Sequence, residues 1–139
     1  MKILIDTNVV LDVVLVRGIF YENSRKILVL SDETGIGYVS VSQLKDVSYF
    51  VRKMTKSQER AKVSINALSA FVGFLDLGSV DVMTALASPM KDFEDALLAA
   101  CAKRHGMDYI VTRNEADFAH SPVPALTPEQ FLEITNPKG

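Results

Sequence analysis

Five polar side chains of this 139-residue chain are of types suited to holding a divalent cation. They are four aspartates and one asparagine from distant segments: Asp6, Asp46, Asp95, Asn114 and Asp117. Clustered carboxylates repel one another unless a cation joins them, and hard oxygen ligands favour Mg²⁺ or Mn²⁺. If these side chains converge, they predict a metal centre in which a bound cation activates water and offsets developing negative charge.

A structural role has to be weighed against this interpretation for each acid. Asp46 and Asp95 fall in the first turns of predicted helices, where a carboxylate also stabilises the positive end of the helix. Asp6 is different, because it directly follows an apolar run and the Thr-Asn pair after it can already cap the next helix. We therefore expect Asp6 to be functional rather than a cap, and Asp95 to matter next.

Short apolar runs alternate with segments of helical periodicity, which is typical of a parallel sheet covered by helices. Strands are predicted at residues 3–5, 36–41, 79–82, 109–111 and 123–126. Helices are predicted at residues 9–15, 20–30, 42–51, 57–75, 84–88 and 93–104, and a last one opens at Pro128. The expected fold is a single α/β domain over residues 1–139, with three layers (α/β/α) and a small, mostly parallel central sheet.

Such a fold would bring the candidate residues to one edge. Ligands of open α/β sheets bind beyond the carboxyl ends of the strands. Asp6 directly follows the first predicted strand, Asp46 lies in the helix after the second, and Asn114 and Asp117 follow the fourth. Asp95 begins the helix that precedes the fourth strand. The order of elements therefore predicts that these residues share one site.

Composition limits the functional classes. Hydrophobic residues make up 48% of the chain, which is enough for a folded core. The formal net charge of −2 excludes a strongly basic nucleic-acid binder, although bound cations can supply the missing positive charge. Cys101 is the only cysteine, and no apolar run approaches the ~20 residues that span a bilayer. We expect a cytoplasmic protein that does not enter membranes.

Four segments together resemble the signature motifs of PIN-domain nucleases, in the family's order over nearly the whole chain. The first runs from Ile3 to Asp12, and the second from Asp92 to Ala100, where an acid begins a helix of small residues. The third runs from Tyr109 to Phe118 and the closing one from Leu126 to Leu132. The resemblance implies hydrolysis of phosphodiester bonds, most often in RNA, with Mg²⁺ or Mn²⁺.

The resemblance also assigns roles to individual residues. Asp6 and Asp95 match the family's metal-binding acids, Asp46 stands where the family usually has Glu, and Asn114 stands where many members have Asp. Asp117 either supplies the charge that Asn114 lacks or only caps the loop. By the same resemblance, the residues expected to contact the substrate are Asn8, Thr112 and Arg113.

Partners follow from the same family. Many small members are toxins of the VapC type, each neutralised by a small antitoxin. The resemblance therefore implies an RNA substrate and a possible antitoxin partner. A homodimer is also expected, because family members commonly pair and the helical segments between Ser42 and Leu75 carry much apolar surface.

Two alternatives remain open. The amide of Asn114 and the short side chain of Asp46 favour a non-catalytic PIN-like module that binds nucleic acid or protein. A receiver-like phosphoacceptor domain is also α/β with acids at strand ends. It is disfavoured because the chain lacks an acidic pair ahead of the first helix and a late lysine after a strand.

Overall fold

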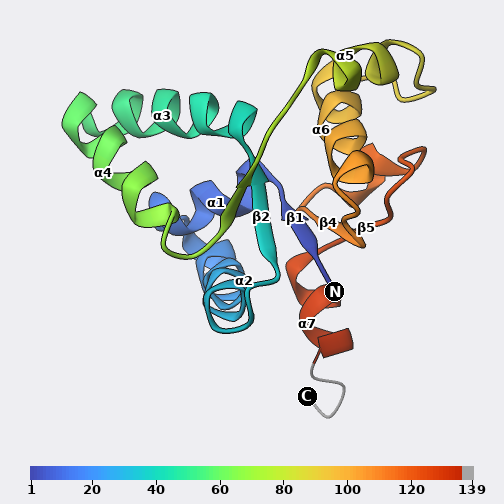
Figure 1. Cartoon of the computed structure of the whole chain (residues 1–139). Coiled ribbons are helices and arrows are strands. Elements are labelled where there is room, and N and C mark those ends of the chain that lie inside the picture. The colour runs from blue at the N-terminus through green and yellow to red at the C-terminus, as the bar shows by residue number, and fades with distance from the viewer. Residues whose placement is uncertain (136–139) are drawn as a thin grey trace.

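A computed structural model describes residues 1–135 as one sheet covered by helices (Figure 1). The sheet has five strands in the order β3-β2-β1-β4-β5, and every neighbouring pair is parallel. The strands are β1 (Ile3–Ile5), β2 (Gly37–Ser40), β3 (Gly73–Leu75), β4 (Tyr109–Val111) and β5 (Ala125–Leu126). The α/β class and the parallel sheet are confirmed. Residues 136–139 of the predicted domain lie outside the described residues.

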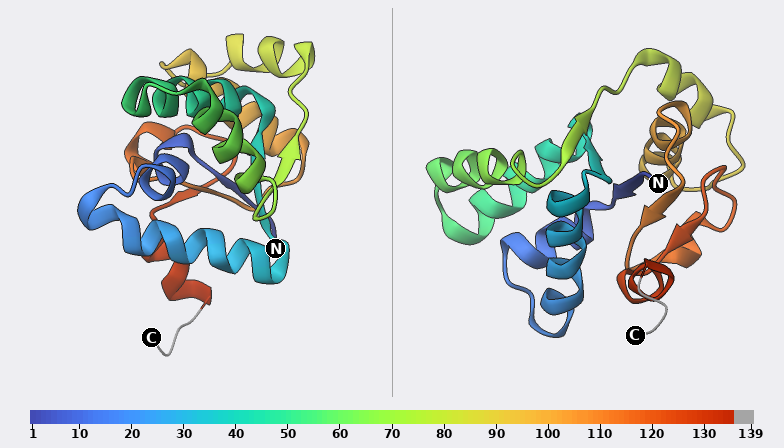
Figure 2. Two further views of the ribbon diagram at one scale, coloured as in Figure 1. Left: turned by 90° about the vertical axis from the view of Figure 1, so that its left-hand side faces the viewer. Right: turned by 60° about the horizontal axis from the view of Figure 1, so that its bottom comes forward.

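Helices cover both faces of the sheet, which gives the three expected layers (Figure 2). On one face lie α1 (Thr7–Val14), α2 (Tyr21–Thr34), α3 (Val41–Thr55), α4 (Gln58–Leu68) and α7 (Pro128–Thr135). On the other lie α5 (Ser79–Leu86) and α6 (Phe93–Arg104). Two short 3-10 helices, η1 (Gly18–Phe20) and η2 (Glu115–Phe118), follow α1 and β4. None of the helices within residues 1–135 is long and apolar enough to cross a membrane.

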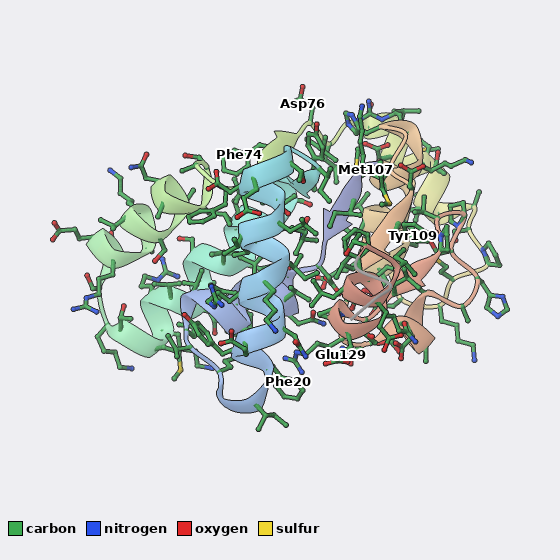
Figure 3. All side chains as sticks on the ribbon, turned by 90° about the horizontal axis from the view of Figure 1, so that it is seen from below. Phe20, Phe74, Asp76, Met107, Tyr109 and Glu129 are labelled. Carbon is green, nitrogen blue, oxygen red and sulfur yellow. The ribbon has the colours of Figure 1, made fainter. Side chains whose placement is uncertain are left out.

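The side chains of β1 are buried on both faces of the sheet. Ile3 and Ile5 pack into the core beneath α1–α4 and α7, whereas Leu4 packs into the core beneath α5 and α6. All three are fully buried, and burial of each such side chain is worth ~1.5–3 kcal/mol. Tyr109, at the start of β4, faces α7, where its ring lies edge-on to that of Phe131 with 6.3 Å between the centroids (Figure 3).

The third strand was predicted in the wrong place. Residues 79–82 form the start of α5, and the predicted helix 57–75 ends at Leu68, so that β3 can pair with β2. Asp81 accepts a hydrogen bond from the Gly78 backbone N–H (2.9 Å) and so caps a helix where a strand was predicted. A three-residue edge strand such as β3 is too short to show a period of two.

Two helix starts also differ from the prediction. Asp6, rather than Thr7 or Asn8, is the N-cap of α1, and Ser40, rather than Ser42, is the N-cap of α3. In both cases the cap is the residue that ends a strand or directly follows one, so each helix begins without an intervening loop. This places the first turns of α1 and α3 at the carboxyl edge of the sheet.

Candidate metal centre at the carboxyl edge of the sheet

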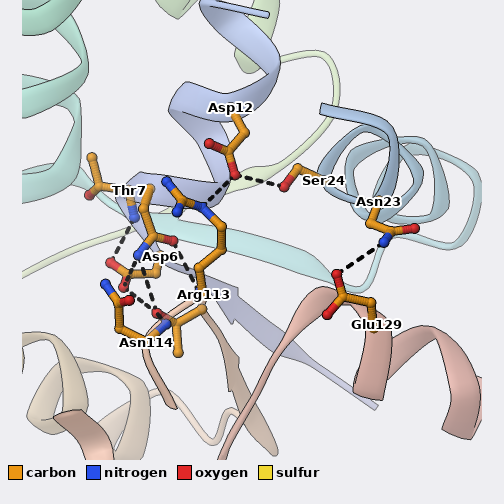
Figure 4. Close-up of polar contacts among 10 residues, drawn as sticks. Asp6, Thr7, Asp12, Asn23, Ser24, Arg113, Asn114 and Glu129 are labelled. Atoms are coloured by element: carbon orange, nitrogen blue, oxygen red, sulfur yellow. Dashed lines mark hydrogen bonds and ion pairs between the residues drawn. The ribbon is translucent and has the colours of Figure 1, made fainter. Parts of the chain in front are cut away.

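Asp6 is fixed in one orientation at the junction of β1 and α1. Its Oδ1 accepts a hydrogen bond from the Thr7 backbone N–H (2.7 Å), and its Oδ2 accepts one from the Thr112 hydroxyl (2.7 Å) at the end of β4 (Figure 4). The Asn8 amide lies 3.4 Å from Oδ2. Within residues 1–135, Oδ1 accepts only the Thr7 hydrogen bond, so it has a second lone pair left for a ligand. Asp6 can therefore cap α1 and bind a metal at the same time, although the sequence led us to expect a functional residue rather than a cap.

The electrostatic setting of Asp6 favours a bound cation. Burial raises the pKa of this carboxyl, while the hydrogen bonds from Thr112 and Thr7 lower it. The charge of Asp117 raises the pKa further, and that of Arg113 opposes the rise. A cation would offset both the desolvation and the repulsion from Asp117.

Asp95 lies in the first turn of α6, and its carboxylate interacts with several others. Its backbone N–H donates to the side chain of Asp92, the N-cap of the helix (2.9 Å). Burial raises the pKa of Asp95 to about 6, and repulsion from Asp92, Asp6, Asp117 and Glu94 contributes to that rise. Asp6, Asp95 and Asp117 thus come close enough to repel one another, which brings together three of the predicted residues.

Asp46 reaches the same region from α3. The buried side chain of Gln43 donates to the Ile5 carbonyl (2.7 Å), and this bond holds the first turn of α3 against the end of β1. Asp46 follows one turn later and is exposed. A cleft of about 770 Å³ is lined by Asp6, Asp46 and Asp95 together.

A second, smaller cleft of about 350 Å³ shares Asp95 with the first. It is lined by Asp92, Asp95 and Asp117, together with Lys91 and His120. Asp95 therefore stands between two hollows, one on the side of Asp6 and one on the side of Asp117. A polymer passing over Asp95 would have room on both sides.

Three predicted residues lie outside the lining of both clefts. Thr112 is fully buried and its hydroxyl donates to Asp6, so it supports a carboxylate. The Arg113 side chain turns toward Asp12 and lines neither cleft. Asn114 is exposed and also lines neither cleft, and its backbone N–H donates to Thr112 (3.1 Å). Asn8, in contrast, lines the large cleft, and its role as a substrate contact stays a prediction.

Several residues that line the clefts were not singled out from the sequence. The large cleft also contains two cations, Arg17 and Lys45, and three aromatic side chains, Tyr49, Phe50 and Phe93. The small one contains Lys91 and His120. Arg17 follows α1 and Lys45 precedes Asp46. Single surface cations carry little information in a sequence, so neither residue could be singled out.

The donor set fits a hard divalent cation bound with few protein ligands. Residues 1–135 contain no group of three or more His, Cys, Asp or Glu side chains arranged as a ready cage. Mg²⁺ is usually held by one or two carboxylates and keeps several waters, so a cage of this kind is not required. Asp6 and Asp95, on a strand end and a helix start, are the two carboxylates best fixed for that role.

The raised pKa of Asp95 predicts a pH-dependent effect of Asp95→Asn on the metal-free protein. Because the folded-state pKa is about 6 and the ordinary value is 3.8, the folded chain binds more protons than the unfolded chain between these values. The contribution of the Asp95 carboxyl to the stability of the fold is therefore full below its ordinary pKa of 3.8. It is lost as the pH rises through about 6. Asparagine mimics the neutral acid.

Thermal denaturation in chelator should thus show a higher Tm for Asp95→Asn than for the unaltered chain at pH 7.5. The difference should shrink at pH 4.5, where the aspartate is itself protonated when folded. An equal difference at both pH values would contradict the repulsion assigned to this carboxylate.

Comparison with known proteins identifies the family of this chain and solved structures of similar fold. The sequence matches a family model described as PIN domain over residues 2–116. No curated protein sequence matches the chain. Its fold is similar to VapBC2 from Rickettsia felis bound to a DNA fragment from its promoter, with 16% identity and a TM-score of 0.71. That alignment covers 91% of this chain and 98% of the other.

Two other solved structures have the same fold. A toxin-antitoxin complex from Klebsiella pneumoniae has 22% identity and a TM-score of 0.69, and the alignment covers 91% of this chain and 98% of the other. VapC20 from Mycobacterium tuberculosis, described as a sarcin-ricin loop cleaving toxin, has 14% identity and a TM-score of 0.64. Its alignment covers 78% of this chain and 87% of the other. The family model spans most of the sequence, and the solved structures share the sheet and its flanking helices, so the chain belongs to the PIN-domain family.

Proposed function

We propose that this chain is a metal-dependent endoribonuclease that hydrolyses phosphodiester bonds with Mg²⁺ or Mn²⁺. The observation that carries the proposal is the pairing of Asp6 and Asp95 in one cleft, on two rigid elements, with the pKa of each raised above its ordinary value. Carboxylates that have shifted pKa values and lie together in a cleft are typical of functional sites. PIN domains are typically nucleases, which agrees with this assignment.

Each residue has a distinct part in the proposed reaction. A bound cation would supply Lewis-acid activation of water and charge to balance the phosphate. Asp6 and Asp95 would hold that cation, and Thr7 and Thr112 keep the Asp6 carboxylate from rotating. Asp46 and Asp117 line the clefts on either side and add negative charge that strengthens cation binding.

Substrate contacts are proposed along both clefts. Asn8, Arg17 and Lys45 line the large one, where an amide and two cations can contact phosphate or sugar oxygens. Lys91 and His120 line the small one beside Asp117. RNA is the proposed polymer because VapC20, a structural relative, is described as cleaving the sarcin-ricin loop.

The test is cleavage of RNA by the purified chain. Single-stranded and hairpin RNA should be cut when Mn²⁺ or Mg²⁺ is present and left intact when chelator is in excess. Cleavage that continues unchanged in excess chelator would exclude the metal-dependent mechanism. The Asp95→Asn variant, purified in parallel, controls for a contaminating nuclease.

A non-catalytic binding module is the second candidate. The exposed Asn114, which lines neither cleft and adds no charge, is the observation that favours it. In that case RNA would bind without being cut, and Asn114→Asp would not create activity. Binding and cleavage measured on the same RNA separate the two candidates.

Partners are proposed from the same relatives. The Klebsiella pneumoniae structure is a toxin-antitoxin complex, and we propose a small antitoxin for this chain as well. A homodimer through the segments between Ser42 and Leu75 stays a prediction. It is supported by exposed apolar side chains on α3 and α4, among them Met54 and Val63. Sedimentation equilibrium that shows only monomer at high micromolar concentration would contradict the dimer.

A further inference from the structure

A fully buried carboxylate lies one and a half helical turns beyond Asp6. Asp12, in α1, is 0% exposed. Its Oδ2 accepts hydrogen bonds from Arg113 Nε (2.8 Å) and from the Ser24 hydroxyl (3.0 Å) in α2 (Figure 4). Its Oδ1 is buried and has no hydrogen-bond partner among residues 1–135. An ionised group buried and half satisfied is costly, so stability alone does not account for it.

Arg113 is clamped at two points. Its guanidinium is paired with Asp12, and its central carbon lies 4.0 Å from the centroid of the Phe20 ring in η1. Its backbone N–H donates to the Asn8 side chain (3.3 Å). The segment that leaves β4 is therefore fastened to α1 through both the backbone and the side chain of one residue.

The clamp acts on the neighbours of Arg113. The preceding residue, Thr112, donates its hydroxyl to Asp6 Oδ2 and accepts from the backbone N–H of Asn114. Asp6 caps the start of α1 and Asp12 lies in its last turns, so one helix receives contacts from the consecutive residues Thr112 and Arg113. A shift of this segment away from α1 would draw the Thr112 hydroxyl away from Asp6.

We propose that the Asp12–Arg113 ion pair is a positioning device, which holds Thr112 against Asp6 and so fixes the orientation in which the Asp6 carboxylate receives a divalent cation. Arg113 and Asp12 are positioning residues, because neither lines a cleft. Groups that orient a metal ligand change metal affinity or activity when altered, typically about 10–100-fold. The inference rests on the proposed metal-dependent function, and deepens it.

The ion pair can be removed without leaving a buried charge behind. The variant Asp12→Leu/Ser24→Ala/Arg113→Met replaces the three polar groups with apolar side chains, and such replacement of a buried ion pair often leaves the fold intact. The Met side chain can still contact Phe20. A merely structural pair would then leave the metal site as it was.

The experiment measures Mn²⁺ affinity by electron paramagnetic resonance of the free ion, together with kcat and KM for RNA. The triple variant should fold, bind Mn²⁺ about 10–100-fold more weakly and lose kcat at fixed Mn²⁺, with KM for RNA unchanged. Unchanged Mn²⁺ affinity in the folded variant would overturn the proposal.

A matched control exists in α5 and α6. Asp81 is almost fully buried and receives two hydrogen bonds from Arg104, each 2.8 Å, at the opposite end of α6 from Asp95. Asp81→Leu/Arg104→Met removes a comparable ion pair, and it should leave Mn²⁺ affinity and kcat unchanged. Equal losses in both variants would show that any buried ion pair has this effect, and would overturn the specific role of Asp12 and Arg113.

Two further outcomes are a triple variant that does not fold and an unaltered chain that binds Mn²⁺ without cutting RNA. If the triple variant does not fold, Arg113→Lys keeps a charge beside Asp12 without the planar fork, and it should weaken Mn²⁺ binding by about 3–10-fold; unchanged affinity overturns the proposal. If the unaltered chain binds Mn²⁺ through Asp6 but cuts no RNA, the ribonuclease function fails. The positioning role is then still tested by comparing the Mn²⁺ affinity of the variant with that of the unaltered chain.

Discussion

Asp6→Asn and Asp95→Asn should each reduce RNA cleavage by at least about 1,000-fold, which corresponds to ~4 kcal/mol of activation free energy. Each change removes one negative charge from the proposed cation site and leaves the shape of the side chain nearly unchanged. Without metal, the Tm of both variants should be unchanged or higher, because burial and like charges raise the pKa of both carboxyls. Initial rates with Mn²⁺ and melting curves in chelator measure the two effects.

Asparagine is the informative substitution at Asp6 because it retains the helix cap. Asn caps helices about as well as Asp: its side-chain oxygen can accept the hydrogen bond from the Thr7 N–H, and its amide NH2 can donate to the Thr112 hydroxyl oxygen. Asp6→Ala removes the cap as well, and should therefore lower the free energy of unfolding by about 1 kcal/mol. Activity that survives in both asparagine variants would mean that these acids only cap helices.

Arg113→Met alone should lower the free energy of unfolding by about 3–5 kcal/mol, the usual effect of leaving one buried charge without its partner. Asp12 is 0% exposed, and its other oxygen already lacks a partner within the described chain. The loss would be concentrated where α1, α2 and the end of β4 meet. Urea denaturation with an unchanged m-value is the appropriate measurement.

A surface ion pair provides the comparison. Arg25 and Glu22 are also 2.8 Å apart, but both are exposed to solvent. Arg25→Met should change stability little, because exposed ion pairs contribute little. If the two substitutions have the same effect, Asp12 is not held as a buried charge by Arg113.

The placement of Asp6 and Asp95 in one cleft could be predicted because it depends on short stretches of sequence. Asp6 directly follows a strand whose three residues are all apolar, and Asp95 lies in the first turn of a helix rich in Ala and Leu. The parallel sheet then brings both to one edge. No knowledge of side-chain packing was needed for either residue.

Features that depend on contacts between distant segments could not be predicted in the same way. Arg113 and Asp12 are 101 residues apart, and nothing in either segment indicates that they pair. Arg113 was therefore predicted to contact substrate. β3 lacks a periodic signal and becomes a strand only through pairing with β2, where Gly73 packs against the Tyr38 ring. The capping role of Asp6 was missed because Thr7 and Asn8 looked sufficient.

The most direct test of the central claim is an anomalous difference map from crystals soaked in Mn²⁺. We expect a peak coordinated by carboxylate oxygens of both Asp6 and Asp95, which disappears in crystals of Asp6→Asn. A chain that cuts RNA in solution but shows no Mn²⁺ at either carboxylate, or shows it bound elsewhere, would contradict the proposed centre.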